Sequence, residues 1–131
     1  MINFVVLEDN NRHVKIVRNY IERYMEDKTF GCDIYRFSNI NSRFESFVKN
    51  NVGKNIYILD FMLGENNFNT GLDAARIIRE YDWISPIIFL SVNVDNSYHV
   101  FKSRLNILDF VDKMDNPEAA LRRCLKFVLR N

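Results

Sequence analysis

Cysteine is scarce in this sequence, and its two copies, Cys32 and Cys124, lie far apart and in no CxxC spacing. This scarcity argues against a disulfide framework or a cysteine-bound zinc ion, and it is typical of buried thiols in a reducing compartment. Long apolar runs are also missing, since none approaches the roughly 20 residues of a membrane span. No basic segment precedes the apolar stretch that follows Met1. We therefore expect a cytoplasmic protein without a membrane partner.

The chain also lacks an excess of either charge, because 18 lysines and arginines stand against 17 aspartates and glutamates. Nothing in this balance indicates a nucleic-acid footprint or attraction to an anionic membrane surface. With 131 residues, 47% of them hydrophobic, the chain can bury one core. No repeat, linker or low-complexity segment divides it. We expect a single domain over residues 1–131.

Apolar runs of strand length alternate with amphipathic stretches at helical spacing. The predicted strands are Ile2–Leu7, Cys32–Phe37, Asn55–Asp60, Pro86–Ser91 and Ile107–Val111. Helices are predicted after an N-cap at Asn10, after a turn at Ser38–Ser42, and over Leu72–Tyr81, Asp95–Ser103 and Pro117–Leu129. A polar surface loop is expected from Gly64 to Gly71. This alternation predicts an α/β fold with a parallel sheet and crossover helices.

Polar side chains stand where the predicted strands end. They are Glu8 and Asp9 after the first strand, Asp60 ending the third, Ser91 ending the fourth, and Lys113 just past the fifth. Reactive groups of open parallel sheets gather at the carboxyl ends of the strands, so we expect these side chains to meet at one edge. The two histidines, His13 and His99, are expected on the surface.

Three neighbouring carboxylates repel one another at neutral pH unless protons or a cation compensate their charge. Oxygen ligands without His or Cys favour Mg²⁺, with Mn²⁺ possible, over zinc. Phosphoryl transfer needs little beyond positioning, charge neutralisation and an in-line nucleophile, and an aspartate can be that nucleophile by forming an acyl phosphate. The pattern therefore predicts a Mg²⁺-dependent phosphoryl acceptor, with Asp60 receiving the group beside Glu8 and Asp9.

The whole chain resembles the receiver domain of a bacterial two-component response regulator. The segments that carry the resemblance are the acidic opening motif Val5–Asn10, the phosphoacceptor strand Ile58–Leu63, the hydroxyl-bearing strand Ile88–Ser91 and the lysine strand Leu108–Lys113. The resemblance implies a flavodoxin-like (βα)5 fold, with a five-stranded parallel sheet in the order 2-1-3-4-5 and helices on both faces.

The resemblance also implies a role for each residue at the metal. Asp60 would be the phosphorylation site, Asp9 a direct metal ligand, and Glu8 a ligand through water or a supporting acid. The backbone carbonyl of Met62 would complete the protein's contacts to the ion. We hypothesise that the bulky Met62 side chain also hinders the attacking water and so prolongs the phosphorylated state.

On the same grounds, Ser91 would hydrogen-bond a phosphoryl oxygen and Lys113 would neutralise another. Phe110 matches the switch aromatic, which turns inward as the hydroxyl residue moves, although an ordinary core role for it stays open. The phosphoryl donor would be a sensor histidine kinase, and the chain would catalyse only its own phosphorylation and dephosphorylation. The helix–strand–helix face from Asp95 to Leu129 would respond, and it could support a homodimer.

Departures from the common receiver pattern are similar to AgrA-like regulators, which carry a LytTR DNA-binding domain and answer peptide quorum-sensing kinases. These features are Met114-Asp115 in place of proline after Lys113, a long loop after Asp60, and the segments Ile77–Asp82 and Ile87–Phe89. The sequence stops at Asn131, where an output domain would begin. DNA would be reached only through such a domain, with transcription as the controlled process.

Three other classes of protein share part of this sequence pattern. A haloacid-dehalogenase-like phosphatase needs a second aspartate two residues after the nucleophile, where Met62 stands. A flavodoxin-like cofactor module needs a Ser/Thr/Gly-rich loop after the first strand, where Glu8 and Asp9 would repel phosphate. A pseudo-receiver, which keeps the fold as an interaction module without using phosphate, stays open, although the complete strand-end set argues against it.

Overall fold

Five parallel strands form the central sheet of the computed structural model, which describes residues 1–63, 69–92 and 97–130. Their order is β2-β1-β3-β6-β7, which is the predicted order 2-1-3-4-5. The strands are β1 (Ile2–Leu7), β2 (Cys32–Phe37), β3 (Lys54–Asp60), β6 (Ile87–Ser91) and β7 (Asp109–Asp112). The predicted strand Ile107–Val111 begins two residues later in the structure, at Asp109. The Leu108 amide, just before it, nevertheless donates to the Ile87 carbonyl at 2.8 Å.

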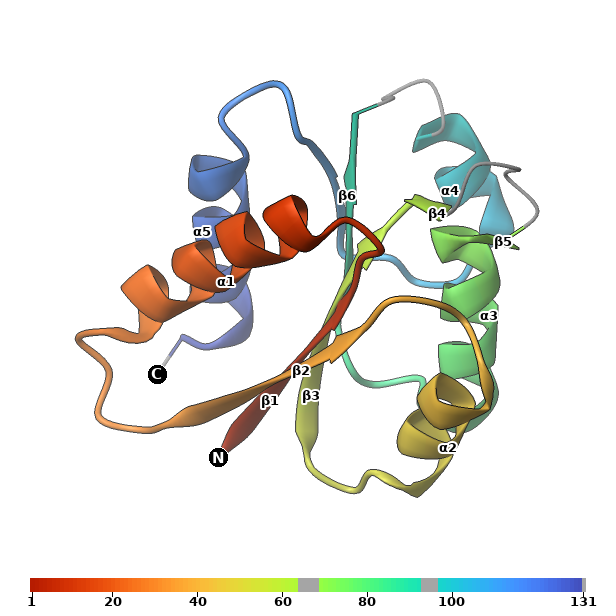
Figure 1. The fold of residues 1–131 in the computed structure, drawn as a ribbon, viewed down its shortest axis with the longest axis horizontal. Coiled ribbons are helices and arrows are strands. Elements are labelled where there is room, and N and C mark those ends of the chain that lie inside the picture. The colour runs from red at the N-terminus through yellow and green to blue at the C-terminus, as the bar shows by residue number, and fades with distance from the viewer. Residues whose placement is uncertain (64–68, 93–96, 131) are drawn as a thin grey trace.

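Helices cover both faces of this sheet (Figure 1). On one face lie α1 (Asn11–Met25) and α5 (Pro117–Val128), and on the other lie α2 (Ser42–Asn50), α3 (Gly71–Tyr81) and α4 (Ser97–Ser103). Alternate residues of β1 enter the two resulting cores, with Phe4 and Val6 on the α1 and α5 side and Val5 and Leu7 on the other. Burial on both faces explains why the central strands β1, β3 and β6 are mostly apolar, whereas the edge strand β2 carries exposed polar residues.

The first helix begins where the sequence predicts. The side-chain oxygen of Asn10 accepts the backbone N–H groups of Arg12 and His13 at 2.9 and 3.1 Å, and so satisfies donors that have no partner within the helix. Val17, Ile21 and Tyr24 recur at helical spacing and are buried against the sheet. The N-cap and the buried face of α1 together fix how the chain leaves the carboxyl end of β1.

The segment after Asp60 differs from the predicted surface loop. Met62–Leu63 (β4) and Asn69–Thr70 (β5) pair as a short antiparallel ladder that leads directly into α3. Backbone pairing of this kind leaves no trace in an Asn-rich composition, which is why the sequence predicted only a loop. Residues 64–68 lie outside the described residues, as do the first two residues of the predicted helix Asp95–Ser103.

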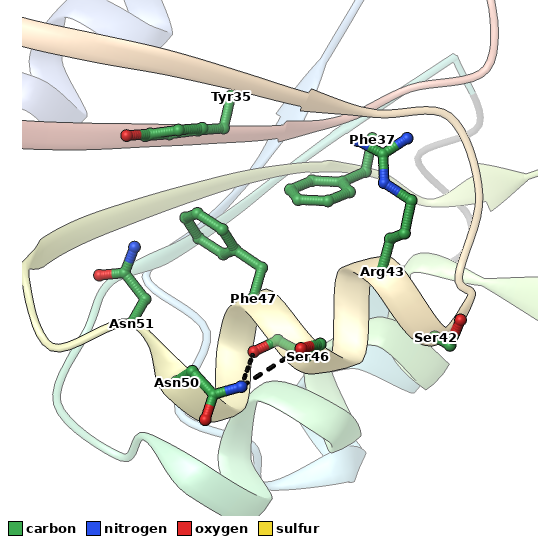
Figure 2. Close-up of a pocket in the computed structure, with 8 residues that line it drawn as sticks. All are labelled: Tyr35, Phe37, Ser42, Arg43, Ser46, Phe47, Asn50 and Asn51. Atoms are coloured by element: carbon green, nitrogen blue, oxygen red, sulfur yellow. Dashed lines mark hydrogen bonds between the residues drawn. The ribbon is translucent and has the colours of Figure 1, made fainter.

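A shallow groove runs between the edge strand β2 and helix α2 (Figure 2). Its volume is about 790 Å³, and one side of it is aromatic, because the rings of Tyr35 and Phe37 lie 5.0 and 5.4 Å from that of Phe47. The other side carries polar side chains of α2, among them Asn50, whose amide donates to the Ser46 carbonyl at 2.9 Å. None of the polar strand-end residues lines this groove, so the candidate site lies elsewhere.

Candidate functional site

Residues from both ends of the chain meet at the carboxyl ends of the strands. The Lys113 ammonium lies 2.8 Å from Glu8 Oε1 and 3.5 Å from Asp60 Oδ2. The Lys113 amide donates to the Ser91 carbonyl at 2.8 Å, which ties the exit of β7 to the end of β6. The parallel register brings these ends together, because β1 pairs with β3, β3 with β6, and β6 with β7.

Glu8, Asp9 and Asp60 form a carboxylate cluster in which one oxygen from each lies within 4.8 Å of the others. Glu8 is only 3% exposed, Asp60 is half-buried and Asp9 is exposed, so the cluster opens to solvent on the Asp9 side. Three converging carboxylate oxygens with no His or Cys are a donor set that suits a hard divalent cation such as Mg²⁺. The arrangement therefore fits the predicted metal.

The raised pKa of Asp60 also favours a bound cation at this cluster. Burial raises the pKa of this carboxyl from 3.8 to about 7, Lys113 opposes the rise, and the nearby Glu8 charge adds to it. The Met62 amide donates to Asp60 Oδ1 at 3.3 Å and favours the ionised form. A carboxylate that is so hard to ionise gains from a bound cation, which would compensate the charge that burial and Glu8 disfavour.

Arg36 holds the acidic loop in place, a role that sequence reasoning missed. Its Nε donates to the Glu8 carbonyl at 3.0 Å, and its Nη2 lies 3.4 Å from the Asp9 carbonyl and 2.9 Å from Asn11 Oδ1. The backbone N–H of Asn10 in turn donates to Glu8 Oε2 at 3.1 Å. A lone arginine in a half-exposed strand gives no sequence signal for this function, because β2 and the loop meet only in the folded sheet.

Gly71, at the start of α3, allows the backbone to approach the Asp60 strand end. Its amide donates to the Phe61 carbonyl at 2.7 Å. A Cβ at this position would lie 2.5 Å from the Asp60 carbonyl oxygen and 2.7 Å from the Phe89 ring. Glycine is therefore required here by close packing. The sequence signal is a glycine directly before a helical pattern, which by itself indicates only the end of a loop.

The remaining predicted residues lie around Asp60. Ser91 is fully buried at the end of β6. Phe110 packs inward, with its ring 5.7 Å from that of Phe61 and 6.0 Å from that of Phe89, so an aromatic cluster connects the residue after Asp60 to β7. This inward position is compatible with a core role and with a switch role. Coordination by the Met62 carbonyl stays a prediction.

His13 lies at the surface as expected, but it also contacts the site. Its side chain is about one-third exposed, but Nδ1 lies 3.3 Å from Lys113 Nζ and 3.5 Å from Glu8 Oε1. Helical periodicity placed it on the outside of α1, whereas the loop after β7 comes back across the first turn of that helix. The side chain of His99 lies outside the described residues.

Comparison with solved structures identifies the fold. The chain superimposes on the non-phosphorylated HemR receiver domain of Leptospira biflexa with a TM-score of 0.74, at 20% identity over 100% of this chain and 96% of that one. A response regulator receiver domain protein of Clostridium thermocellum gives 0.75, at 16% identity over 98% and 94%. The receiver domain of a Pseudomonas aeruginosa sensor histidine kinase, with a magnesium ion coordinated in its active site cleft, gives 0.73 at 17% identity over 95% and 94%.

The architecture is therefore a flavodoxin-like α/β sandwich. Within that class it is the fold of response regulator receiver domains. No protein-family model and no curated protein sequence matches the chain. Among residues 1–63, 69–92 and 97–130, no helix is long and apolar enough to cross a lipid bilayer.

Proposed function

We propose that this chain is a phosphoacceptor receiver in which Asp60 accepts a phosphoryl group from the phosphohistidine of a sensor histidine kinase, in a Mg²⁺-dependent reaction. One observation carries the proposal. Glu8, Asp9 and Asp60 bring carboxylate oxygens within 4.8 Å of one another, with the Lys113 ammonium in contact, at the carboxyl end of a sheet with the receiver fold. Positioning and charge neutralisation are what phosphoryl transfer needs.

The chemistry assigns one task to each group. An Asp60 oxygen attacks phosphorus as the bond from phosphorus to the imidazole nitrogen of the donor breaks. The bonding electron pair stays on that nitrogen, which takes a proton from water. Glu8, Asp9, Asp60 and the Met62 carbonyl would hold Mg²⁺, or Mn²⁺ in its place, and the bound ion would neutralise phosphoryl oxygens and keep Asp60 ionised. Lys113 neutralises a further phosphoryl oxygen.

The signal would then leave the site through β6 and β7. Ser91 would hydrogen-bond the phosphoryl group, and Phe110 would repack within its aromatic cluster as Ser91 moves. The face made by α4, β7 and α5 would read out this change, either to an output domain or by pairing with a second copy. Sizing the protein with and without a phosphodonor tests the homodimer, which requires a larger species only in the phosphorylated sample.

The finer assignment rests on sequence features alone. We propose an AgrA-like regulator that controls transcription in quorum sensing, on the strength of Met114-Asp115 after Lys113 and of the segment Ile77–Asp82. Such a chain would work in the cytoplasm and reach DNA only through a LytTR domain. It would be no enzyme in the ordinary sense, because it would turn over only its own phosphoryl group.

Intact-mass measurement tests the central claim. The protein is incubated with acetyl phosphate and Mg²⁺, and we expect a gain of one phosphoryl group that is lost when EDTA replaces Mg²⁺. The gain should vanish in Asp60→Asn and persist in the matched control Asp33→Asn, which alters an exposed aspartate on β2. A wild-type protein that gains no mass, or one in which Asp60→Asn gains it equally, would refute the proposal and favour the pseudo-receiver.

A further inference from the structure

Three acceptors surround the Lys113 ammonium. Glu8 Oε1 lies 2.8 Å from Nζ, His13 Nδ1 lies 3.3 Å away, and Asp60 Oδ2 lies 3.5 Å away. A lysine ammonium has three N–H groups and no acceptor, so it can face all three atoms at once. The Lys113 side chain is 13% exposed, which leaves little room for water to replace one of them.

Because the ammonium is a donor only, a hydrogen bond between these two side chains requires His13 Nδ1 to be the acceptor. Glu8 Oε1, 3.5 Å from Nδ1, already receives the shorter contact from Lys113. A proton on Nδ1 would lie close to the ammonium at 3.3 Å as well as to Glu8 Oε1 at 3.5 Å, and the ammonium would repel it. With its ring proton on Nε2, the imidazole presents the Nδ1 lone pair to Lys113.

Both partners are held by their backbones. The His13 amide is capped by Asn10 Oδ1 at 3.1 Å, and the Lys113 amide is bound to the Ser91 carbonyl at 2.8 Å. The two side chains share the rim of a recess of about 150 Å³ whose walls include the apolar Val17 and Leu90.

We propose that His13 is a positioning residue for the phosphorylation of Asp60, acting through Lys113. By accepting one N–H of the ammonium, His13 leaves the other two directed at Glu8 and Asp60, without adding negative charge where the phosphoryl group arrives. A carboxylate at this position would hold the lysine equally well but would repel phosphate. Without His13, the ammonium can rotate toward Glu8 and solvent, and part of its alignment with Asp60 is lost. The effect of His13 on the phosphorylation rate rests on the proposed function. The contact between His13 and Lys113 can be tested independently of that function.

A matched pair of variants isolates the acceptor. His13→Asn keeps an acceptor atom close to the place of Nδ1, whereas His13→Leu has nearly the same shape as asparagine and no acceptor. The backbone amide that Asn10 caps is present in both. The first readout is the ¹⁵N spectrum of the lysine ammonium groups, recorded without Mg²⁺ at one fixed pH and assigned by the loss of a peak in Lys113→Arg. A protected Lys113 signal should appear in wild type and His13→Asn and be broadened or absent in His13→Leu.

The second readout is the rate of phosphorylation by acetyl phosphate with Mg²⁺, followed by intact mass. The loss of one hydrogen bond of ordinary net strength should slow His13→Leu by about two- to tenfold, and His13→Asn should retain most of the rate. In a Lys113→Gln background, His13→Leu should have no further effect, because its action passes through Lys113. If His13 had a purely structural role, His13→Leu would slow phosphorylation equally in the wild-type and Lys113→Gln backgrounds.

The outcomes separate the two claims. An ammonium signal that is unchanged in His13→Leu, or equal phosphorylation rates for wild type and His13→Leu, overturns the role of His13 and leaves the role of Asp60 as acceptor untouched. A wild-type protein that shows the protected Lys113 signal and its dependence on His13, yet gains no phosphoryl group, supports the contact and refutes the proposed function together with its catalytic consequence.

Discussion

Replacing Asp60 by asparagine should stabilise the protein at neutral pH when no divalent cation is present. The Asp60 side chain is 11% exposed, and its burial raises the pKa of the carboxyl from 3.8 to about 7. The folded state therefore resists ionisation of a group that ionises freely in the unfolded chain. The neutral amide avoids this cost while it keeps the shape of the side chain.

The pH range follows from the sign of the shift. Because the folded-state pKa lies above the unfolded value, the contribution of Asp60 to stability is fully present below about pH 4 and is lost as the pH rises through about 7. The rise in pKa corresponds to at most about 4 kcal/mol. We expect about 1–2 kcal/mol in practice, because solvent on the Asp9 side screens the charges and the variant also loses the attraction of Lys113.

Urea unfolding in EDTA at several pH values measures this effect. The free energy of unfolding of Asp60→Asn minus that of wild type should grow between about pH 4 and pH 7 and then level off. Asp33→Asn, on an exposed aspartate, should track wild type within about 0.5 kcal/mol. Mg²⁺ at about a hundredfold excess over its dissociation constant should raise the free energy of unfolding of wild type by about 2.7 kcal/mol. A variant that is less stable than wild type at pH 7, or a difference that is independent of pH, refutes the reasoning.

Three further changes test the site. Lys113→Met leaves the buried Glu8 carboxylate without its lysine partner. We expect the free energy of unfolding in urea to fall by about 3 kcal/mol at neutral pH, whereas the exposed control Lys54→Met should show no measurable change. Gly71→Ala should lower the free energy of unfolding by about 2–3 kcal/mol, because its Cβ would lie 2.5 Å from the Asp60 carbonyl oxygen. The control Gly31→Ala, whose Cβ has its nearest contact at 3.6 Å, should leave the stability nearly unchanged. Equal effects of the two substitutions would argue against the close approach at Gly71. Met62→Asn should speed dephosphorylation by removing a bulky apolar side chain beside Asp60, and equal decay of the two phosphoproteins by intact mass would count against this.

The sequence predicted the scaffold because the scaffold is set by local patterns. The ranges Ile2–Leu7 and Cys32–Phe37 are strands in the structure with the bounds that their apolar runs predicted, and Asn10 caps α1 as its chemistry suggests. Strand order agreed too, but it came from a resemblance to receivers and not from periodicity. The two short strands after Asp60 were missed, since pairing between polar backbones leaves no periodic signal.

By itself, the sequence determined which residue types stand at the strand ends, because each apolar run stops at a polar side chain such as Asp60 or Ser91. It could not show what holds those side chains. Only the tertiary structure brings Arg36 to the carbonyls of the acidic loop, presses Gly71 against the Asp60 backbone, and sets His13 beside Lys113. Each of these contacts joins segments that are distant in the chain. Their distances depend on how the twisted sheet and the helices pack, and no local pattern records that packing.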